Sequence, residues 1–171
     1  MTVDIGFAKS AVGVIGEELF EPMILKVGAN ATAAKMLPGI AVVRDTNDYS
    51  VKEFTSGSAV VGVIGWEKTP MKWRPATRDT AYAVGDELAI HRGPCVIRMR
   101  LSISQTIVKG DLLTLTTDGY LTKATINGVV AIDQSGNGTV STGNSDVFAK
   151  ALESVTTTSP ATGVIWVLVE R

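Results

Sequence analysis

The sequence predicts an all-β protein, built as a small β-barrel or sandwich of hairpins with an extended N-terminal arm. Val, Ile and Thr make up close to a third of the 171 residues, and these β-branched side chains fit a pleated, half-buried surface. Short apolar runs alternate with turns rich in Gly, Pro, Asn and Asp. One segment, residues 97–104, shows the strict apolar/polar alternation of a half-buried strand.

The first 38 residues differ from the rest of the chain. Several glycines interrupt any periodic pattern, and Pro22 ends any helix that begins near Glu17. We therefore expect an extended arm over residues 1–38 with one or two short strands. Its apolar side chains, Phe7 and Phe20 among them, must be buried against the body of the chain or a neighbouring subunit.

From residue 39 to residue 171 the pattern becomes strand, turn, strand, which predicts one β-barrel-like domain. Two segments resemble copies of one unit, because Gly85-Asp86 and Gly110-Asp111 each precede an apolar strand and a second Gly turn. Residues 133–144 are rich in Gly, Ser and Asn, which predicts a mobile loop or hairpin tip. Strands are expected over residues 39–44, 49–54, 59–66, 97–104, 126–132 and 163–171.

Composition excludes several classes of function. The net charge of −1 argues against a nucleic-acid coat or a polybasic membrane binder, so no nucleic acid and no membrane is expected as a partner. A single Cys excludes an intrachain disulfide, and a single His excludes a His-rich metal site. No apolar run approaches a membrane span, and the N-terminus lacks a secretory pattern. We expect synthesis in a reducing cytoplasm, with no cofactor and no metal.

No catalytic constellation emerges from the residues. His91 lies in a predicted turn, where a solvated side chain is the ordinary outcome. Cys95 follows four residues later, so a Cys–His pair is conceivable, but its apolar neighbours favour a small core residue. We therefore expect a protein that is not an enzyme and has no catalytic residue.

A contact surface is the main functional feature that the residues suggest. Two prolines prevent regular structure in the loop over residues 67–80, and Trp73 stands there between two basic residues. Residues 66–100 carry seven basic and four acidic side chains in a chain whose net charge is −1, which suits docking on an acidic surface or on another copy. Two alternatives stay open: Trp73 could cap one end of a barrel, and the charges could form an ordinary solvated face. The candidate contact residues are Phe7, Phe20, Met71, Lys72, Trp73, Arg74, Arg98 and Arg100, of which Arg98 and Arg100 are expected to point outward from one strand.

The order of these elements resembles the capsid decoration, or cement, proteins of tailed bacteriophages. The resemblance lies in Leu37-Pro-Gly-Ile-Ala-Val-Val with Val60-Val-Gly-Val-Ile, in the paired Tyr82-x-x-Gly-Asp and Ile107-x-x-Gly-Asp units, and in Ala149-Lys-Ala-Leu-Glu before the terminal strand from Gly163. It implies a small barrel-like protein, usually a homotrimer, on the outer surface of the virion. Such a protein binds an icosahedral head and bridges neighbouring subunits of the major capsid protein.

Other functions remain open at this stage. The sequence features do not separate the decoration role from that of a trimeric head-fibre base or a tail structural component. A small-ligand-binding β-barrel, or an unrecognised enzyme that uses His91 and Cys95, is the less favoured reading.

Overall fold

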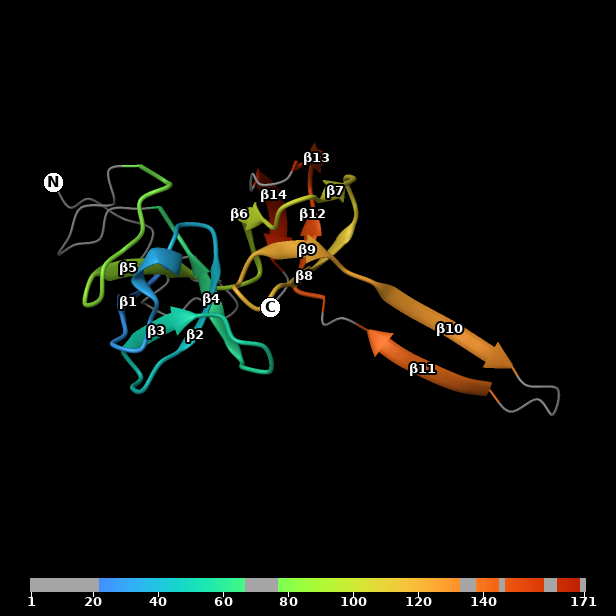
Figure 1. Ribbon diagram of the computed structural model, residues 1–171, viewed down its shortest axis with the longest axis horizontal. Helices are drawn as coiled ribbons and strands as arrows, with labels where there is room; N and C mark the ends of the chain where they lie inside the picture. The colour runs from blue at the N-terminus through green and yellow to red at the C-terminus, as the bar shows by residue number, and fades with distance from the viewer. Residues whose placement is uncertain (1–21, 67–76, 133–137, 145–146, 159–162, 170–171) are drawn as a thin grey trace, which may run out of the picture.

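The computed structural model describes residues 22–66, 77–132, 138–144, 147–158 and 163–169, and within them the protein is all-β (Figure 1). The predicted fold class is confirmed, with one addition: the strands form two small closed barrels of five strands each. The β-barrel-like domain predicted over residues 39–171 thus holds four strands of the first barrel and all five of the second.

The first barrel closes in the order β1-β3-β2-β4-β5. Its only parallel contact joins β1 to β3, and the other four contacts are antiparallel. A short 3₁₀ turn, η1 (Ala33–Lys35), connects the first two strands. The strands are β1 (Met23–Val27), β2 (Ala41–Arg44), β3 (Ser50–Glu53), β4 (Val60–Ile64) and β5 (Glu87–His91).

The second barrel repeats the connectivity of the first. In chain order its strands also close as first, third, second, fourth, fifth, and again only the first and third are parallel. The chain is therefore a tandem structural repeat. The strands are β6 (Cys95–Leu101), β8 (Leu112–Leu115), β9 (Leu121–Lys123), β12 (Ala149–Ala151) and β14 (Gly163–Val169), and a separate pair joins β7 (Thr106–Ile107) to β13 (Val155–Thr156).

The repeat of the barrel topology does not coincide with the repeat of the Gly-Asp turns that the sequence suggests. The Gly85-Asp86 turn precedes β5, the fifth strand of its barrel, whereas Gly110-Asp111 precedes β8, the second strand of the other. The two turns nevertheless share their local chemistry. In each, the Asp carboxylate accepts a hydrogen bond from the N–H three residues earlier, at 3.0 Å from Ala83 and at 2.9 Å from Val108. The Gly-Asp sequence therefore specifies a local turn structure, and this turn occurs at two different positions of the same barrel topology.

Residues 22–38, the described part of the predicted arm, contribute one strand, and this strand packs into the first barrel. β1 is a full member of the first barrel, antiparallel to β5 and parallel to β3. Its alternation explains this, since Leu25 and Val27 are buried while Ile24 and Lys26 are exposed. Phe7 and Phe20 lie outside the described residues.

The prediction for residues 133–144 needs a correction. Residues Gly138–Asn144 form a strand, β11, which pairs with β10 (Ile126–Ile132) over seven residue pairs. Main-chain hydrogen bonds hold this ribbon together, and they do not require the apolar side chains by which strands are predicted from sequence. Figure 1 shows the β10–β11 ribbon extending away from both barrels.

One pH-dependent contribution to stability comes from the second Gly-Asp turn. The side chain of Lys123 pairs with the Asp111 carboxylate at 2.8 Å, and together with the Val108 N–H it lowers the pKa of that carboxyl. Because folding favours the ionised form, the stabilisation is complete above the ordinary aspartate pKa of about 3.9 and is lost as the pH falls through the folded value. Asp111→Asn should therefore lower the thermal midpoint at neutral pH, and the difference from wild type should shrink in acid. A difference that persists unchanged in acid would contradict the ion pair as its cause.

Gly119 offers a test of how closely the two barrels approach. Gly119 and Gly57 have nearly the same left-handed backbone, with φ of 79° and 82°. A Cβ on Gly57 meets nothing within 4 Å, whereas one on Gly119 would lie 2.5 Å from the carbonyl oxygen of Ala41 in the other barrel. Both Ala substitutions incur a left-handed penalty of roughly 1–2 kcal/mol. We expect Gly119→Ala to cost at least about 1 kcal/mol more than Gly57→Ala in denaturant unfolding; equal costs would contradict the close approach.

Candidate functional site

The junction between the barrels is organised around Arg100. The β6 strand follows β5 directly, and the predicted alternation places Arg98 and Arg100 on the same side of it. Arg98 is exposed as expected, but only 6% of Arg100 is exposed. The prediction that Arg100 points outward is therefore wrong.

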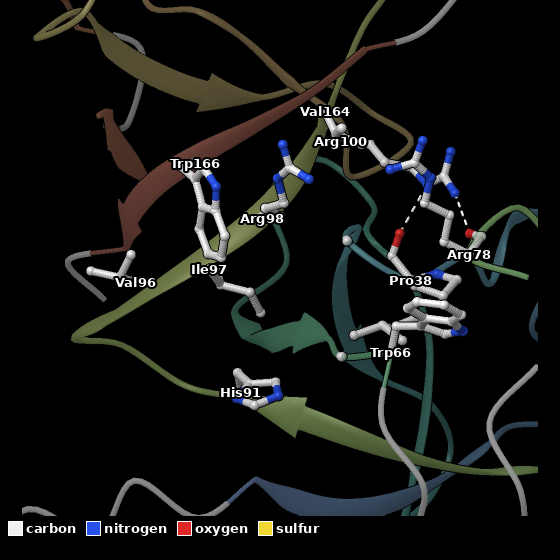
Figure 2. Close-up of a pocket in the computed structure, with 13 residues that line it drawn as sticks. Pro38, Trp66, Arg78, His91, Val96, Ile97, Arg98, Arg100, Val164 and Trp166 are labelled. Carbon is white, nitrogen blue, oxygen red and sulfur yellow. Dashed lines mark hydrogen bonds between the residues drawn. The ribbon is translucent and has the colours of Figure 1, made fainter. Parts of the chain in front are cut away.

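Arg100 is buried because the first barrel supplies it with acceptors. Its Nε donates to the carbonyl oxygen of Pro38 at 2.9 Å, and its guanidinium also donates to the carbonyl of Arg78 (Figure 2). The same group pairs with the Asp79 carboxylate at 2.9 Å. Its backbone N–H donates to Gly39 at 2.9 Å. A buried guanidinium is tolerated when its donors are matched in this way.

Further contacts complete this junction, which we call the seam. The N–H of Ala41 in β2 donates to the Gly119 carbonyl at 3.0 Å, and Lys35 pairs with Asp118 at 2.6 Å. Apolar packing crosses it too, because Ala41 and Val63 of the first barrel belong to the core cluster of the second. Burial of apolar surface together with paired polar groups holds the barrels in one orientation.

A cavity of about 380 Å³ opens beside Arg100, and we call it the inter-barrel cleft. Figure 2 shows Trp166 and Arg98 on the side of the second barrel, with Trp66 and His91 on the side of the first. Among the described residues that line it, three are arginines (Arg78, Arg98 and Arg100) and none is acidic. Arg100 is paired with Asp79, so the positive charge beside the aromatic surface of the cleft comes from Arg78 and Arg98.

The aromatic side chains of the cleft are partly open to solvent. Trp66 is 38% exposed and Trp166 is 43% exposed, and Val96 beside them is 58% exposed. The Arg98 guanidinium lies 5.3 Å from the centroid of the Trp166 ring, at cation–π distance. Tryptophan and arginine are the residues that most often dominate binding energy at protein interfaces. This arrangement suits an apolar or aromatic group that carries a negative charge.

His91 and Cys95 lie in different environments. His91 lines the cleft, where its ring packs so closely that a Cβ on Gly65 would be 2.6 Å from Nε2. Cys95 packs against the core of the second barrel, and burial raises the pKa of its thiol. A raised pKa favours the thiol over the nucleophilic thiolate, which is opposite to the tuning of a catalytic cysteine.

Metal ligation and membrane spanning are two further properties that bear on function. Across the residues that the structure describes, no group of three or more His, Cys, Asp or Glu side chains is placed to hold a metal ion. No helix in that part of the chain combines the length and apolar character needed to cross a membrane.

Of the predicted contact residues, the structure places Arg98 at the cleft and Arg100 in the seam. Met71, Lys72, Trp73 and Arg74 lie outside the described residues. Sequence reasoning missed Trp66 and Trp166. The signal for Trp166 was present, because it stands between Ile165 and Val167, both buried, on the outward-facing positions of the terminal strand.

Comparison with known proteins adds no relative: no protein-family model matches the chain, and no curated protein matches it.

Arg100 and Arg98 provide a matched pair for testing the seam. Arg100→Ala leaves the carbonyls of Pro38 and Arg78 without their donor, and each unsatisfied buried acceptor costs roughly 1–3 kcal/mol. We expect a loss of about 2–4 kcal/mol in urea unfolding. Arg98→Ala, two residues along the same strand, should cost less than about 1 kcal/mol because it removes an exposed cation–π contact. Equal losses would show that Arg100 does not hold the barrels together.

Proposed function

We propose that this protein is a capsid decoration protein of a tailed bacteriophage. In this role it is made in the host cytoplasm, binds the outer surface of the icosahedral head and bridges neighbouring subunits of the major capsid protein. It acts without catalysis. Its second partner is the same chain, with which it forms a homotrimer. The order of sequence features from Leu37 to the terminal strand supports this proposal.

The single structural observation that carries the proposal is the inter-barrel cleft. Its arginines, its two half-exposed tryptophans and the lack of acidic side chains among its described lining residues suit a protein partner that presents an acidic group beside an apolar one. Electrostatic complementarity would orient the partner, and the buried aromatic area would supply most of the affinity.

The double barrel also suits a bridging role. A protein that links capsid subunits needs a stiff body, because flexibility between its contact points would weaken the link. The seam joins the two barrels through hydrogen bonds, an ion pair and shared apolar packing. Many copies on one shell would then act together, since avidity multiplies individually weak contacts.

Binding to shells tests the proposal. Purified empty heads that lack decoration are mixed with the full chain and sedimented, and bound protein is measured against its concentration. Trp166→Ala should weaken binding at least about tenfold, since buried interface tryptophans contribute roughly 2 kcal/mol or more. Tyr49→Ala removes an exposed aromatic side chain that is not among the described lining residues of the cleft and should bind within about twofold of wild type.

The outcomes separate the function from the site. Failure of the wild-type chain to bind heads would overturn the decoration role. Normal binding by Trp166→Ala would keep that role but remove the cleft from it. Labelling of the protein on intact particles distinguishes decoration from a head-fibre or tail role, because label confined to a vertex or the tail favours the latter.

A second candidate function is favoured by the size of the cleft. A volume of about 380 Å³ falls within the range of roughly 300–1,000 Å³ that small-molecule sites occupy. A small aromatic carboxylate would match its arginines and tryptophans. Native mass spectrometry of the purified protein tests this, because a bound molecule that Trp166→Ala loses would favour it.

A further inference from the structure

The inter-barrel cleft gathers large apolar side chains that are open to solvent. Trp66, Val96 and Trp166 are among the exposed apolar residues of the described chain, and all three line the cleft. Figure 2 shows Trp66 on one side of the cleft and Val96 with Trp166 on the other. Exposed apolar side chains that lie together in this way generally mark a surface that another segment or molecule covers.

Basic side chains accompany this apolar surface. Arg78 and Arg98 line the cleft, and both belong to segments that meet at the seam. Arg92 is exposed directly after His91, which also lines the cleft. An occupant that matches the cleft therefore combines acidic and apolar side chains.

The chain enters the first barrel beside the cleft. Met23, the first residue of β1, lies opposite Ile90 in β5, and Ile90 lies opposite Ile64 in β4. Ile64 and His91, the residue after Ile90, both line the cleft. Because neighbouring strands lie about 4.8 Å apart, the segment that precedes Met23 starts within roughly 10 Å of the cleft lining.

The sequence before Met23 has the composition that the cleft requires. Residues 1–21 lie outside the described residues, and their sequence contains four acidic residues and one basic residue. Three of these acidic residues flank two large apolar ones in Glu17-Glu18-Leu19-Phe20-Glu21, which we call the acidic motif. Residues 17–22 span up to about 20 Å when extended, so the motif can reach the cleft of its own chain.

The acidic motif has an advantage over a free partner because it belongs to the same chain. A short tether raises the effective concentration of a segment to roughly the millimolar range, so a weak contact is enough to occupy the cleft. Residues 67–76 also adjoin the cleft in the sequence, since they directly follow Trp66, but they contain three basic residues and one acidic residue. Arg78 and Arg98 would repel that segment and attract the acidic motif.

We propose that the acidic motif covers the inter-barrel cleft of its own chain in the free protein. The carboxylates of the motif pair with Arg78 and Arg98, and Leu19 and Phe20 pack against the exposed tryptophans. The motif thereby regulates the cleft, because a partner binds only the fraction of molecules whose cleft is open. This regulatory step rests on the proposed function, which assigns the cleft to a capsid subunit.

Labelling of a single thiol in the free protein tests whether the motif covers the cleft. Cys95→Ala removes the one native thiol, and Val96→Cys then places a thiol in the cleft lining. A bulky maleimide reacts only with the open fraction, so a cleft covered about 80% of the time slows labelling about fivefold. We expect labelling to be at least about fivefold slower in this chain than in a charge-reversed chain that also carries Glu17→Lys, Glu18→Lys and Glu21→Lys.

Two control variants distinguish a local cover from a general change in the protein. Val108 is 55% exposed and Val96 is 58% exposed, but Val108 is not among the described lining residues of the cleft. Val108→Cys, again with Cys95→Ala, should therefore react at the same rate with and without the charge reversals. Asp4→Lys changes an acidic residue outside the motif and should leave labelling of Val96→Cys slow.

The labelling outcomes decide the position of the motif without any capsid. Equal labelling of Val96→Cys in the two chains would overturn the proposal, and so would an equally large change at Val108→Cys. Protection that disappears when the protein is diluted would overturn the assignment to the same chain, because it would show that the motif comes from a neighbouring copy.

Binding to undecorated heads tests the regulatory step separately. The charge-reversed chain with its native Cys95 and Val96 should bind heads about fivefold more tightly than wild type, because its cleft is open. Equal binding by the two chains would overturn the regulation and leave the cover to the labelling result. Failure of both chains to bind heads would overturn the proposed function and the regulatory step together, while slow labelling of Val96→Cys would still support the cover.

Discussion

The buried guanidinium of Arg100 is the constraint on which the arrangement of this molecule depends. A charge removed from water is costly unless its donors are matched, and here the matching groups belong to the other barrel. The hydrogen-bond donors of the Arg100 guanidinium therefore find their acceptors in the first barrel and not in the barrel to which Arg100 belongs. Its requirement couples β6 to residues 38–39 and 78–79. Together with the other contacts of the seam, this coupling holds the two barrels in one orientation.

Two cavities among the described residues follow from that relation. The inter-barrel cleft takes Trp66 and His91 from one barrel and Arg98 and Trp166 from the other. A second cavity likewise combines residues of both, because the loop between β3 and β4 lines it together with strand β8. A single five-stranded barrel of this size fills its interior with side chains and offers no such cavity. Tandem repetition thus supplies concave surfaces that neither barrel has alone.

Most of the strands could be predicted because their signals are local. The alternation over residues 97–104 and the apolar runs at 59–66 and 163–171 reflect burial of one or both faces. The corresponding strands are β6, which ends at Leu101, β4 over Val60–Ile64 and β14 over Gly163–Val169. The repeated topology could not be predicted in this way. The two barrels have the same strand order, but the Gly-Asp turn occupies a different position in each. The repeat of this turn in the sequence therefore indicated a local structure and not the repeat of the whole barrel.

What the sequence by itself determined is the all-β class, the positions of the strands and the scarcity of reactive side chains, since these depend on composition and on a period of two residues. Only the tertiary structure decided that Arg98 and Arg100, identical residues on the same side of one strand, have opposite roles. The reason is physical: whether an arginine is buried depends on acceptors from distant segments, and Pro38 and Arg78 meet Arg100 but not Arg98. The same holds for β11, whose pairing with β10 rests on main-chain hydrogen bonds that side-chain patterns do not encode.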